Sequence, residues 1–188
     1  MKIETIEIAG FAGALTALRL PFGKEVRSRI ETDNYWNDGM DRPTAIWHNE
    51  TDIELDPYDE ILMQTLVKRG DEHAKVVRGI MVWAKITAPV YWWAEAETYR
   101  AGHERLASES TMHIDCKGLS GKELQEAKAA IPMGKELTKV DMFSYQALRR
   151  IVSQRHDHRL PEWHQFIDWI KTLPLAEELI FAGLNLEE

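Results

Sequence analysis

Cys116 is the only cysteine among the 188 residues, so no disulfide bond can hold this fold together. A CxxC-type zinc or redox site within one chain is excluded as well, because such a site needs at least two thiols. A chain of this length buries roughly 70% of the surface that its unfolded form exposes, which is enough for one hydrophobic core. We therefore expect a single domain over residues 1–188, stabilised by apolar burial in a reducing cytoplasm.

The formal net charge of −8 argues against binding to nucleic-acid polymers, because that binding depends on clustered Lys and Arg. A small anionic ligand in a local basic pocket is still compatible with this charge. The sequence has no run of about 18 apolar residues, and its first residues are acidic where a signal peptide needs basic ones. We expect neither secretion nor a membrane span.

Apolar spacing and chain breakers predict an α+β fold, with a mixed sheet flanked by helices and a helix-rich C-terminal half. A Ser cap followed three residues later by Glu123 predicts the start of one helix at Ser120. The segment 24–57, rich in Asp, Asn, Gly and Pro, predicts an irregular surface stretch or a hairpin, and its composition would suit a lid. The expected strands are 2–8 and 76–87, and the expected helices are 12–20, 56–68, 91–106, 120–130, 141–154 and 161–173.

Charge reverses locally at the end of the expected helix 141–154. Four arginines (Arg149, Arg150, Arg155 and Arg159) accompany one acid, Asp157, within eleven residues. Arginine presents a planar fork of donors that suits phosphate or a pyrimidine edge. The alternative is a solvated helix end where cations offset the helix dipole. The nearby histidines lack a fourth ligand at a diagnostic spacing, so we expect no metal.

A second polar cluster follows the expected helix 91–106. Tyr99, Arg100 and His103 precede Ser108, Ser110 and His113, and this set could bind phosphate or exchange protons near neutral pH. The alternative is a polar turn. Five of the seven tryptophans fall within 83–93 and 163–169. For Trp163 and Trp169 burial in the core is the simpler explanation, and for Trp92 and Trp93 it is favoured over stacking on a planar ligand.

The order of several segments across roughly residues 57–172 resembles that of the flavin-dependent thymidylate synthases. The matching segments are His73, the run Ile86-Thr-Ala-Pro89, Tyr99-Arg100 and Leu148 to Arg155. His73 lies sixteen residues before Pro89, which is the family's interval between a Gly-His motif and the end of the next strand. The resemblance is to a divergent, phage-like branch, which places the chain in the cytoplasm, or the host cytoplasm if it is phage-encoded.

The family signature Arg-His-Arg-x-x-Ser-x-Asn-Glu-x-Ser-x-Arg, carried forward from Pro89 without gaps, begins at Thr98. Only Arg100 and Ser108 keep the family's residue. The resemblance implies three sets of site residues. The catalytic set is Tyr99, His103 and Ser108; the substrate-binding set is Arg100, Ser110, His113, Gln146 and Arg155; and the cofactor-binding set is His73 and Ser144.

The resemblance implies folate-dependent one-carbon transfer to C5 of a pyrimidine deoxynucleoside monophosphate, dUMP or dCMP, with methylenetetrahydrofolate as donor in a homotetramer. The product could be a methyl group, reduced with FAD, or a hydroxymethyl group formed without reduction. Loss of the Arg-His-Arg trio, which supports the flavin diphosphate in the family, favours the second reaction, because the diphosphate would lose charge-assisted partners. The family's usual chemistry favours the first. A catalytically inactive nucleotide-binding or structural homologue is the alternative.

Overall fold

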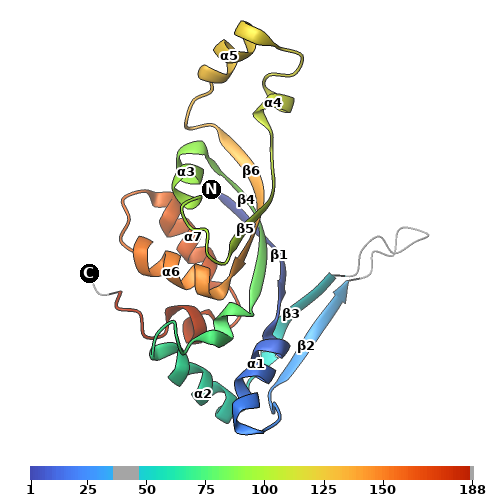
Figure 1. Cartoon of the computed structure of the whole chain (residues 1–188), viewed down its shortest axis with the longest axis vertical. Helices are drawn as coiled ribbons and strands as arrows, with labels where there is room; N and C mark the ends of the chain where they lie inside the picture. Colours follow the sequence, from blue (N-terminus) through green and yellow to red (C-terminus); the bar gives the residue numbers. More distant parts are fainter. Residues whose placement is uncertain (36–46, 187–188) are drawn as a thin grey trace, which may run out of the picture.

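A computed structural model of the chain describes residues 1–35 and 47–186 (Figure 1). The segment 36–46, which falls within the expected lid, lies outside the described residues. The strands are β1 (Lys2–Ala9), β2 (Arg29–Tyr35), β3 (Trp47–Glu54), β4 (Met81–Pro89), β5 (His103–Ser108) and β6 (Glu136–Ser144). The helices are α1 (Phe11–Arg19), α2 (Pro57–Lys68), α3 (Val90–Ala96), α4 (Thr111–Ile114), α5 (Gly121–Ala129), α6 (Tyr145–Arg155) and α7 (Pro161–Lys171), with shorter turns η1 (Leu20–Phe22), η2 (Lys75–Arg78) and η3 (Glu177–Phe181).

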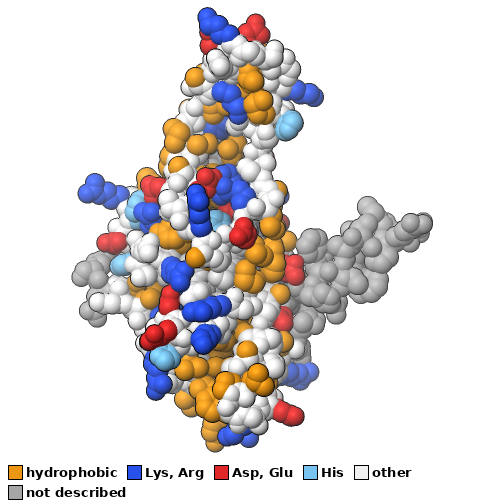
Figure 2. Space-filling model, in the orientation of Figure 1, with side chains coloured by type: hydrophobic (Ala, Val, Ile, Leu, Met, Phe, Trp, Pro, Cys, Tyr) orange, Lys and Arg blue, Asp and Glu red, His pale blue; other side chains and the backbone are white. Residues whose placement is uncertain are grey.

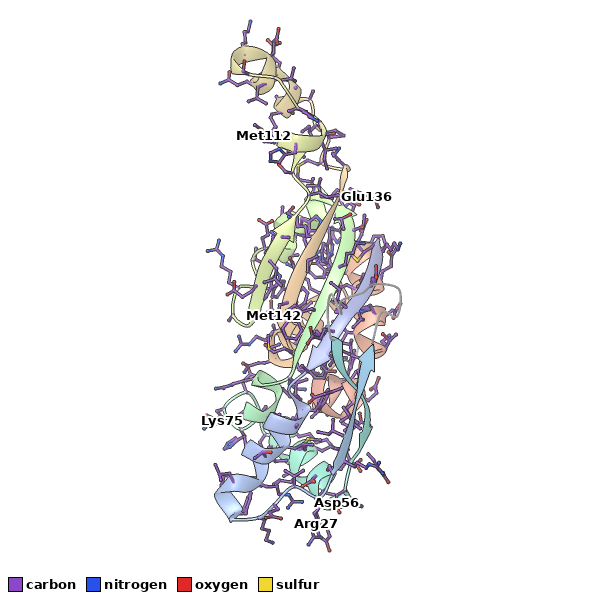
Figure 3. The ribbon with its side chains drawn as sticks, turned by 90° about the vertical axis from the view of Figure 1, so that its right-hand side faces the viewer. Arg27, Asp56, Lys75, Met112, Glu136 and Met142 are labelled. Carbon is purple, nitrogen blue, oxygen red and sulfur yellow. The ribbon has the colours of Figure 1, made fainter. Side chains whose placement is uncertain are left out.

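Four strands form the main sheet in the order β1-β4-β6-β5, and each pairing is antiparallel. Burial alternates along the central strand β4, where Val82, Ala84 and Ile86 are fully buried and Lys85 is exposed. The buried face packs against α6 and α7, and Figure 3 shows the opposite face open toward the viewer. The structure therefore confirms the α+β class with flanking helices. All three strand pairings of the main sheet are antiparallel, where we expected a mixed sheet.

Tryptophan and phenylalanine side chains fill the layer between the sheet and α7. The Trp92 ring lies 4.9 Å from the Trp163 ring and 5.5 Å from that of Phe166, which in turn lies 5.1 Å from that of Trp169. Trp92, Trp163 and Phe166 are almost completely buried. The prediction that these tryptophans belong to the core is confirmed.

Two expected helices are wrong in part, for one physical reason each. The helix expected over 91–106 ends at Ala96, and β5 occupies its second half, because Gly102 takes a φ of +77° that turns the chain back along the sheet. The helix expected from residue 141 begins at Tyr145, because Asp141 to Ser144 complete β6 and Ser144 caps the helix.

Two smaller differences concern the ends of elements. Residues 75–78 form the turn η2, so the strand expected from residue 76 begins at Met81. Helix α5 begins after Ser120 as expected, but the Ser120 side chain makes no capping hydrogen bond. Among the described helices, none is both long and apolar enough to cross a membrane.

The N-terminal half carries a separate hairpin of β2 and β3, as expected for the described part of segment 24–57. Two buried carboxylates attach this hairpin to the helices. Glu50 accepts a hydrogen bond of 2.6 Å from the backbone N–H of Phe11 at the start of α1. Asp59, at the start of α2, accepts from the backbone and side chain of Ser28 just before β2. Negative charge at a helix N-terminus is stabilising, so Glu50 also favours α1 itself.

Residues 109–135, which we name the arm, extend beyond the sheet between β5 and β6 and contain α4 and α5 (Figure 1). The arm buries Cys116 but leaves Met112, Ile114 and Met133 between 43% and 57% exposed. Figure 3 shows Met112 well above the sheet. The arm therefore exposes large apolar side chains that the rest of the described chain does not cover.

Candidate functional site

The tight turn between α3 and β5 brings Thr98 to Gly102 against the start of α6. The backbone N–H of Ser144 donates to the Gly102 carbonyl at 2.7 Å, and the Ser144 Oγ accepts from the Ala147 N–H at 3.1 Å. A Cβ added to Gly102 would lie 2.3 Å from the Ser144 Oγ, so only glycine permits this approach. The predicted cofactor residue Ser144 is thus buried as the cap of α6.

A pocket of about 320 Å³ opens between this turn and α6. Its volume lies at the lower end of the range of roughly 300–1,000 Å³ that is typical of small-molecule sites. Of the predicted site residues, Tyr99 and Arg100 line it. The full lining is Thr98, Tyr99, Arg100, Ala101, Ala147, Arg150 and Gln154.

Arg155 lies behind Tyr99 and does not line this pocket. Its Nε donates to the Tyr99 hydroxyl at 2.8 Å, and its Nη1 lies 3.3 Å from Glu95 Oε2. The same Glu95 oxygen accepts from the Trp163 indole at 2.9 Å. Arg155 also stacks over the Tyr99 and Trp163 rings, at 5.6 and 5.0 Å from their centres. The predicted substrate residue Arg155 therefore fixes Tyr99 through contacts within the chain.

His103 is buried at the first position of β5 with partners on both ring nitrogens. Nδ1 lies 2.7 Å from the Tyr99 carbonyl oxygen, and Nε2 lies 2.7 Å from Asp141 Oδ2. The Tyr99 carbonyl and the Asp141 carboxylate are both hydrogen-bond acceptors, and the ring lies between them. The ring also stacks on Phe143 at 4.4 Å. His103 thus links the Tyr99 turn to the sheet.

Asp141 is fully buried and accepts hydrogen bonds from both His103 and Arg105. Burial alone would raise the pKa of its carboxyl group, but the hydrogen bonds from His103 and Arg105 outweigh burial and hold the pKa below its usual range. Burial alone would lower the pKa of the Arg105 guanidinium, but its interactions with Asp141, and then with Glu97, outweigh burial and raise that pKa. Asp141 thus provides the buried negative charge of this cluster.

Gln146 and His73, two further predicted site residues, do not line the pocket. The amide Nε2 of Gln146, in the first turn of α6, is buried without a hydrogen-bond partner among the described residues. Arg150, which lines the pocket, donates to Asp71 at 3.1 Å. His73 is exposed and lies two positions after Asp71, in the turn at the edge of the site. The buried amide donor of Gln146 is costly to leave without a partner, and a ligand oxygen would satisfy it.

Ser108, Ser110 and His113 do not join this group. Ser108 ends β5 and Ser110 begins α4, while Arg100 precedes the start of β5 (Figure 1). Five residue steps of strand separate the two ends of β5 by about 16 Å. The structure thus divides the predicted site residues into one group near the pocket and another at the base of the arm.

Sequence reasoning missed Glu95, Asp141 and Gln154 as parts of this region, whereas Arg150, one arginine of the predicted cationic cluster, does line the pocket. Asp141 was assigned to the first turn of a helix, where its pairing with Arg105 across two strands could not be seen. Arg149, part of the predicted cationic cluster, is buried and donates to the carbonyl oxygens of Ile180 and Ala182. It therefore attaches the C-terminal segment to α6.

Comparison with known structures identifies the fold. A structure of the flavin-dependent thymidylate synthase ThyX from Helicobacter pylori, solved with FAD and dUMP, matches with a TM-score of 0.67, 11% sequence identity and 100% coverage of both chains. The chain has the fold of the flavin-dependent thymidylate synthases. A second structure of that enzyme gives 0.66 over 98% of this chain and 99% of the other, again at 11% identity.

A further match is the UMP/dUMP methylase PolB from Streptomyces cacaoi, solved with 5-Br dUMP. It superposes with a TM-score of 0.59 at 13% identity, over 97% of this chain and 95% of PolB. No family model matches the sequence, and no curated protein matches it. The fold resemblance inferred from residue order is confirmed, at an identity too low to carry the roles of individual residues.

Proposed function

We propose that this chain binds a pyrimidine deoxynucleoside monophosphate and transfers a one-carbon unit from methylenetetrahydrofolate to its C5. The observation that carries the proposal is the pocket beside α6, lined by Tyr99 and Arg100. The fold supports it, because solved proteins of this fold bind dUMP or its 5-bromo analogue.

Within the proposal, Arg100 holds the nucleotide phosphate and Gln146 binds the pyrimidine edge. Arg100 is exposed at the pocket and can approach a phosphate with a forked pair of donors. Gln146 precedes the pocket residue Ala147, and its buried, unpartnered amide would have to turn toward the pocket to donate to a pyrimidine carbonyl. Tyr99, held by Arg155, is the proposed proton-transfer group at this end of the site.

His103 acts differently in this proposal. Both of its nitrogens already have partners inside the chain, so we assign it to holding the Tyr99 turn in place. Ser144 has the same kind of role, because its hydroxyl caps α6. His73, exposed at the edge of the site, is left as a proposed cofactor contact.

The remaining predicted residues require a second copy. One mononucleotide cannot contact both ends of β5, so Ser108, Ser110 and His113 join the site only if a partner subunit presents its arm to the pocket. The exposed apolar residues Met112, Ile114 and Met133 on the arm support such an assembly, because apolar area of this kind drives association. A homotetramer meets this requirement.

The pocket favours a mononucleotide over FAD. Its volume of about 320 Å³ is well below what a flavin dinucleotide occupies, and Thr98 and Tyr99 offer no cation to a diphosphate. This pocket of one chain therefore suits a mononucleotide, with Arg100 and Arg150 as the cations that line it. Transfer of the folate carbon with addition of water gives a hydroxymethyl group and needs no reductant, whereas a methyl group requires two further electrons. The hydroxymethyl product is the one this chain's own residues favour.

The test combines binding and product mass. Incubation of dUMP or dCMP with methylenetetrahydrofolate, with and without FAD, should give a product heavier by one hydroxymethyl group in the absence of FAD. R100Q should weaken nucleotide binding by about tenfold or more, since a charge-assisted contact to phosphate is lost. The matched control R159Q removes one exposed arginine outside the pocket and should bind as the wild type does. Equal affinities for R100Q and R159Q would remove Arg100 from the site.

The second candidate function is a nucleotide-binding protein without catalysis. It is favoured by Thr98, Arg105 and Ser110, which replace residues of the family signature at three positions. Stabilisation by dUMP or dCMP without any change in nucleotide mass would select it, because a ligand that binds only the native state raises the melting temperature.

A further inference from the structure

A second pocket, of about 630 Å³, lies where α1 ends and α2 begins, at the lower end of the molecule in Figures 1 and 3. Helix α2 is about 18 Å long and separates this pocket from Asp71, which follows α2 and pairs with Arg150 of the nucleotide pocket. The second pocket is thus a separate site. Its lining is Arg19, Lys24, Glu25, Val26, Arg27 and Tyr58.

Arg19 reaches this pocket with part of its guanidinium unsatisfied. Its side chain is only 9% exposed, and its Nε donates to Asp59 Oδ1. The Nη2 atom is buried and has no hydrogen-bond partner among the described residues. Leaving a buried donor unpaired is unfavourable, and more so for a charged group, so the site is stabilised by any ligand that supplies an acceptor.

Asp59 cannot supply that acceptor. Its second oxygen, Oδ2, already accepts from the backbone N–H groups of Arg27 and Ser28 at 3.2 and 3.0 Å, and from the Ser28 hydroxyl at 2.6 Å. Burial alone would raise the pKa of Asp59, but these hydrogen bonds and the one from Arg19 outweigh burial and lower it, so the carboxylate stays charged. The ion pair therefore orients Arg19 without using all of its donors.

The charges on the pocket wall call for an anion. The charge of Arg19 is neutralised by Asp59. The other charged residues of the lining are two exposed cations, Lys24 and Arg27, and one acid, Glu25. Two guanidinium groups and an ammonium group around one cavity suit the several oxygens of a phosphate, since each forms charge-assisted hydrogen bonds. This local excess of positive charge occurs in a chain of net charge −8.

An aromatic ring lies beside the cations. The Arg27 guanidinium carbon is 5.4 Å from the centre of the Tyr58 ring, and Tyr58 is 65% exposed. An exposed ring next to a cation gives a planar ligand group a face to stack on. We propose that this pocket is a second binding site, which takes a small phosphate monoester carrying a planar group, with Arg19, Lys24 and Arg27 on the phosphate and Tyr58 on the ring.

The test uses inorganic phosphate and phenyl phosphate as probes, titrated at constant ionic strength into the whole chain. Backbone amide signals of residues 24–28 should shift in NMR spectra, and phenyl phosphate should bind more tightly than phosphate. K24Q/R27Q should weaken phenyl phosphate binding by about tenfold, since two charge-assisted contacts are lost. Asp59 accepts a hydrogen bond from the backbone N–H of Arg27, which the substitution of its side chain leaves in place. The variant therefore keeps the ion pair between Arg19 and Asp59.

Three controls decide the result. K117Q/K122Q removes two exposed lysines from the arm and should bind as the wild type does. Y58A should remove the advantage of phenyl phosphate over phosphate. R100Q should leave the signals of residues 24–28 responsive, which separates this site from the nucleotide pocket. The proposal is overturned if K24Q/R27Q binds phenyl phosphate as tightly as K117Q/K122Q does, which is the result expected if Glu25 already neutralises Lys24 and Arg27. It is also overturned if R100Q abolishes the response of residues 24–28.

Discussion

The layer behind the sheet and the arm use apolar side chains in opposite ways. Behind the sheet, Trp92, Trp163 and Phe166 are buried against each other, and Phe166 also contacts Phe143 of β6. In the arm, Met112 and Ile114 are exposed although they belong to a helix. The core residues are buried within one chain, while Met112, Ile114 and Met133 of the arm are not covered by any other part of the described chain. The difference separates the region that stabilises the chain from the region that we propose for assembly.

The largest expected effect is in the core. F166A removes a ring that contacts Trp92, Phe143, Trp163 and Trp169, and it should lower the free energy of unfolding by about 3–5 kcal/mol because a cavity remains. The matched arm variant I114A should change it by less than about 0.5 kcal/mol. Urea denaturation of both variants measures the contrast. Similar losses in the two variants would mean that the arm carries part of the core.

The next effect compares two ion pairs. D141N leaves His103 and Arg105 without a buried counter-charge and should cost about 3 kcal/mol of stability. D115N breaks the partly exposed pair between Asp115 and Lys135 in the arm and should cost less than about 1 kcal/mol. Both are read from denaturant midpoints at neutral pH. A small loss in D141N would show that the buried cluster adds orientation and no net stability.

Acid pH tests the contribution of the buried carboxylates Asp59 and Asp141 to stability. The pKa values of Asp59 and Asp141 are lowered in the folded chain, so the unfolded state binds more protons between the folded and unfolded pKa values. Their stabilisation is fully present above roughly pH 4 and is lost as the pH falls through the folded pKa values. D141N should show a shallower loss of unfolding free energy below pH 4 than the wild type. An unchanged slope would contradict the assigned role of Asp141.

The smallest effect on the folded chain is expected from the arm surface. M112S/I114S should change the unfolding free energy of dilute protein by less than about 0.5 kcal/mol, because both side chains are exposed already. The same variant should shift sedimentation toward smaller species if the arm meets a second copy. Unchanged sedimentation together with unchanged nucleotide binding would remove the arm from the proposed site.

Much of this fold could be predicted from local signals in the sequence. The starts of α1, α2 and α7 follow from Gly, Asp and Pro at their boundaries, and the periodic apolar residues of α7 do face the core. The α3–β5 turn could not be predicted, because it depends on the approach of Gly102 to Ser144, which lies 42 positions away in the sequence. The run 136–144 was missed as a strand because the pairing with β4 and β5 decides its structure.

The candidate site was less predictable for the same reason. Residue type alone indicated Tyr99, Arg100 and Arg155 as site residues. Tyr99 and Arg100 line the pocket, whereas Arg155 supports Tyr99 from behind. The position of Arg155 depends on its contacts with Glu95 and Trp163. Side-chain partners of this kind come from separate elements, and sequence spacing does not report them.

The two carboxylates that attach the hairpin join segments far apart in the sequence. Glu50 bonds to a backbone N–H 39 positions away, and Asp59 bonds to a hydroxyl 31 positions away. Because closing such loops costs chain entropy before any contact is gained, we expect the hairpin to dock after α1 and α2 have formed. The amide protons of Phe11, Arg27 and Ser28 are the direct reporters of docking, because their acceptors are these two carboxylates. Their exchange with deuterated water follows the opening of the hairpin, separately from the unfolding of the sheet.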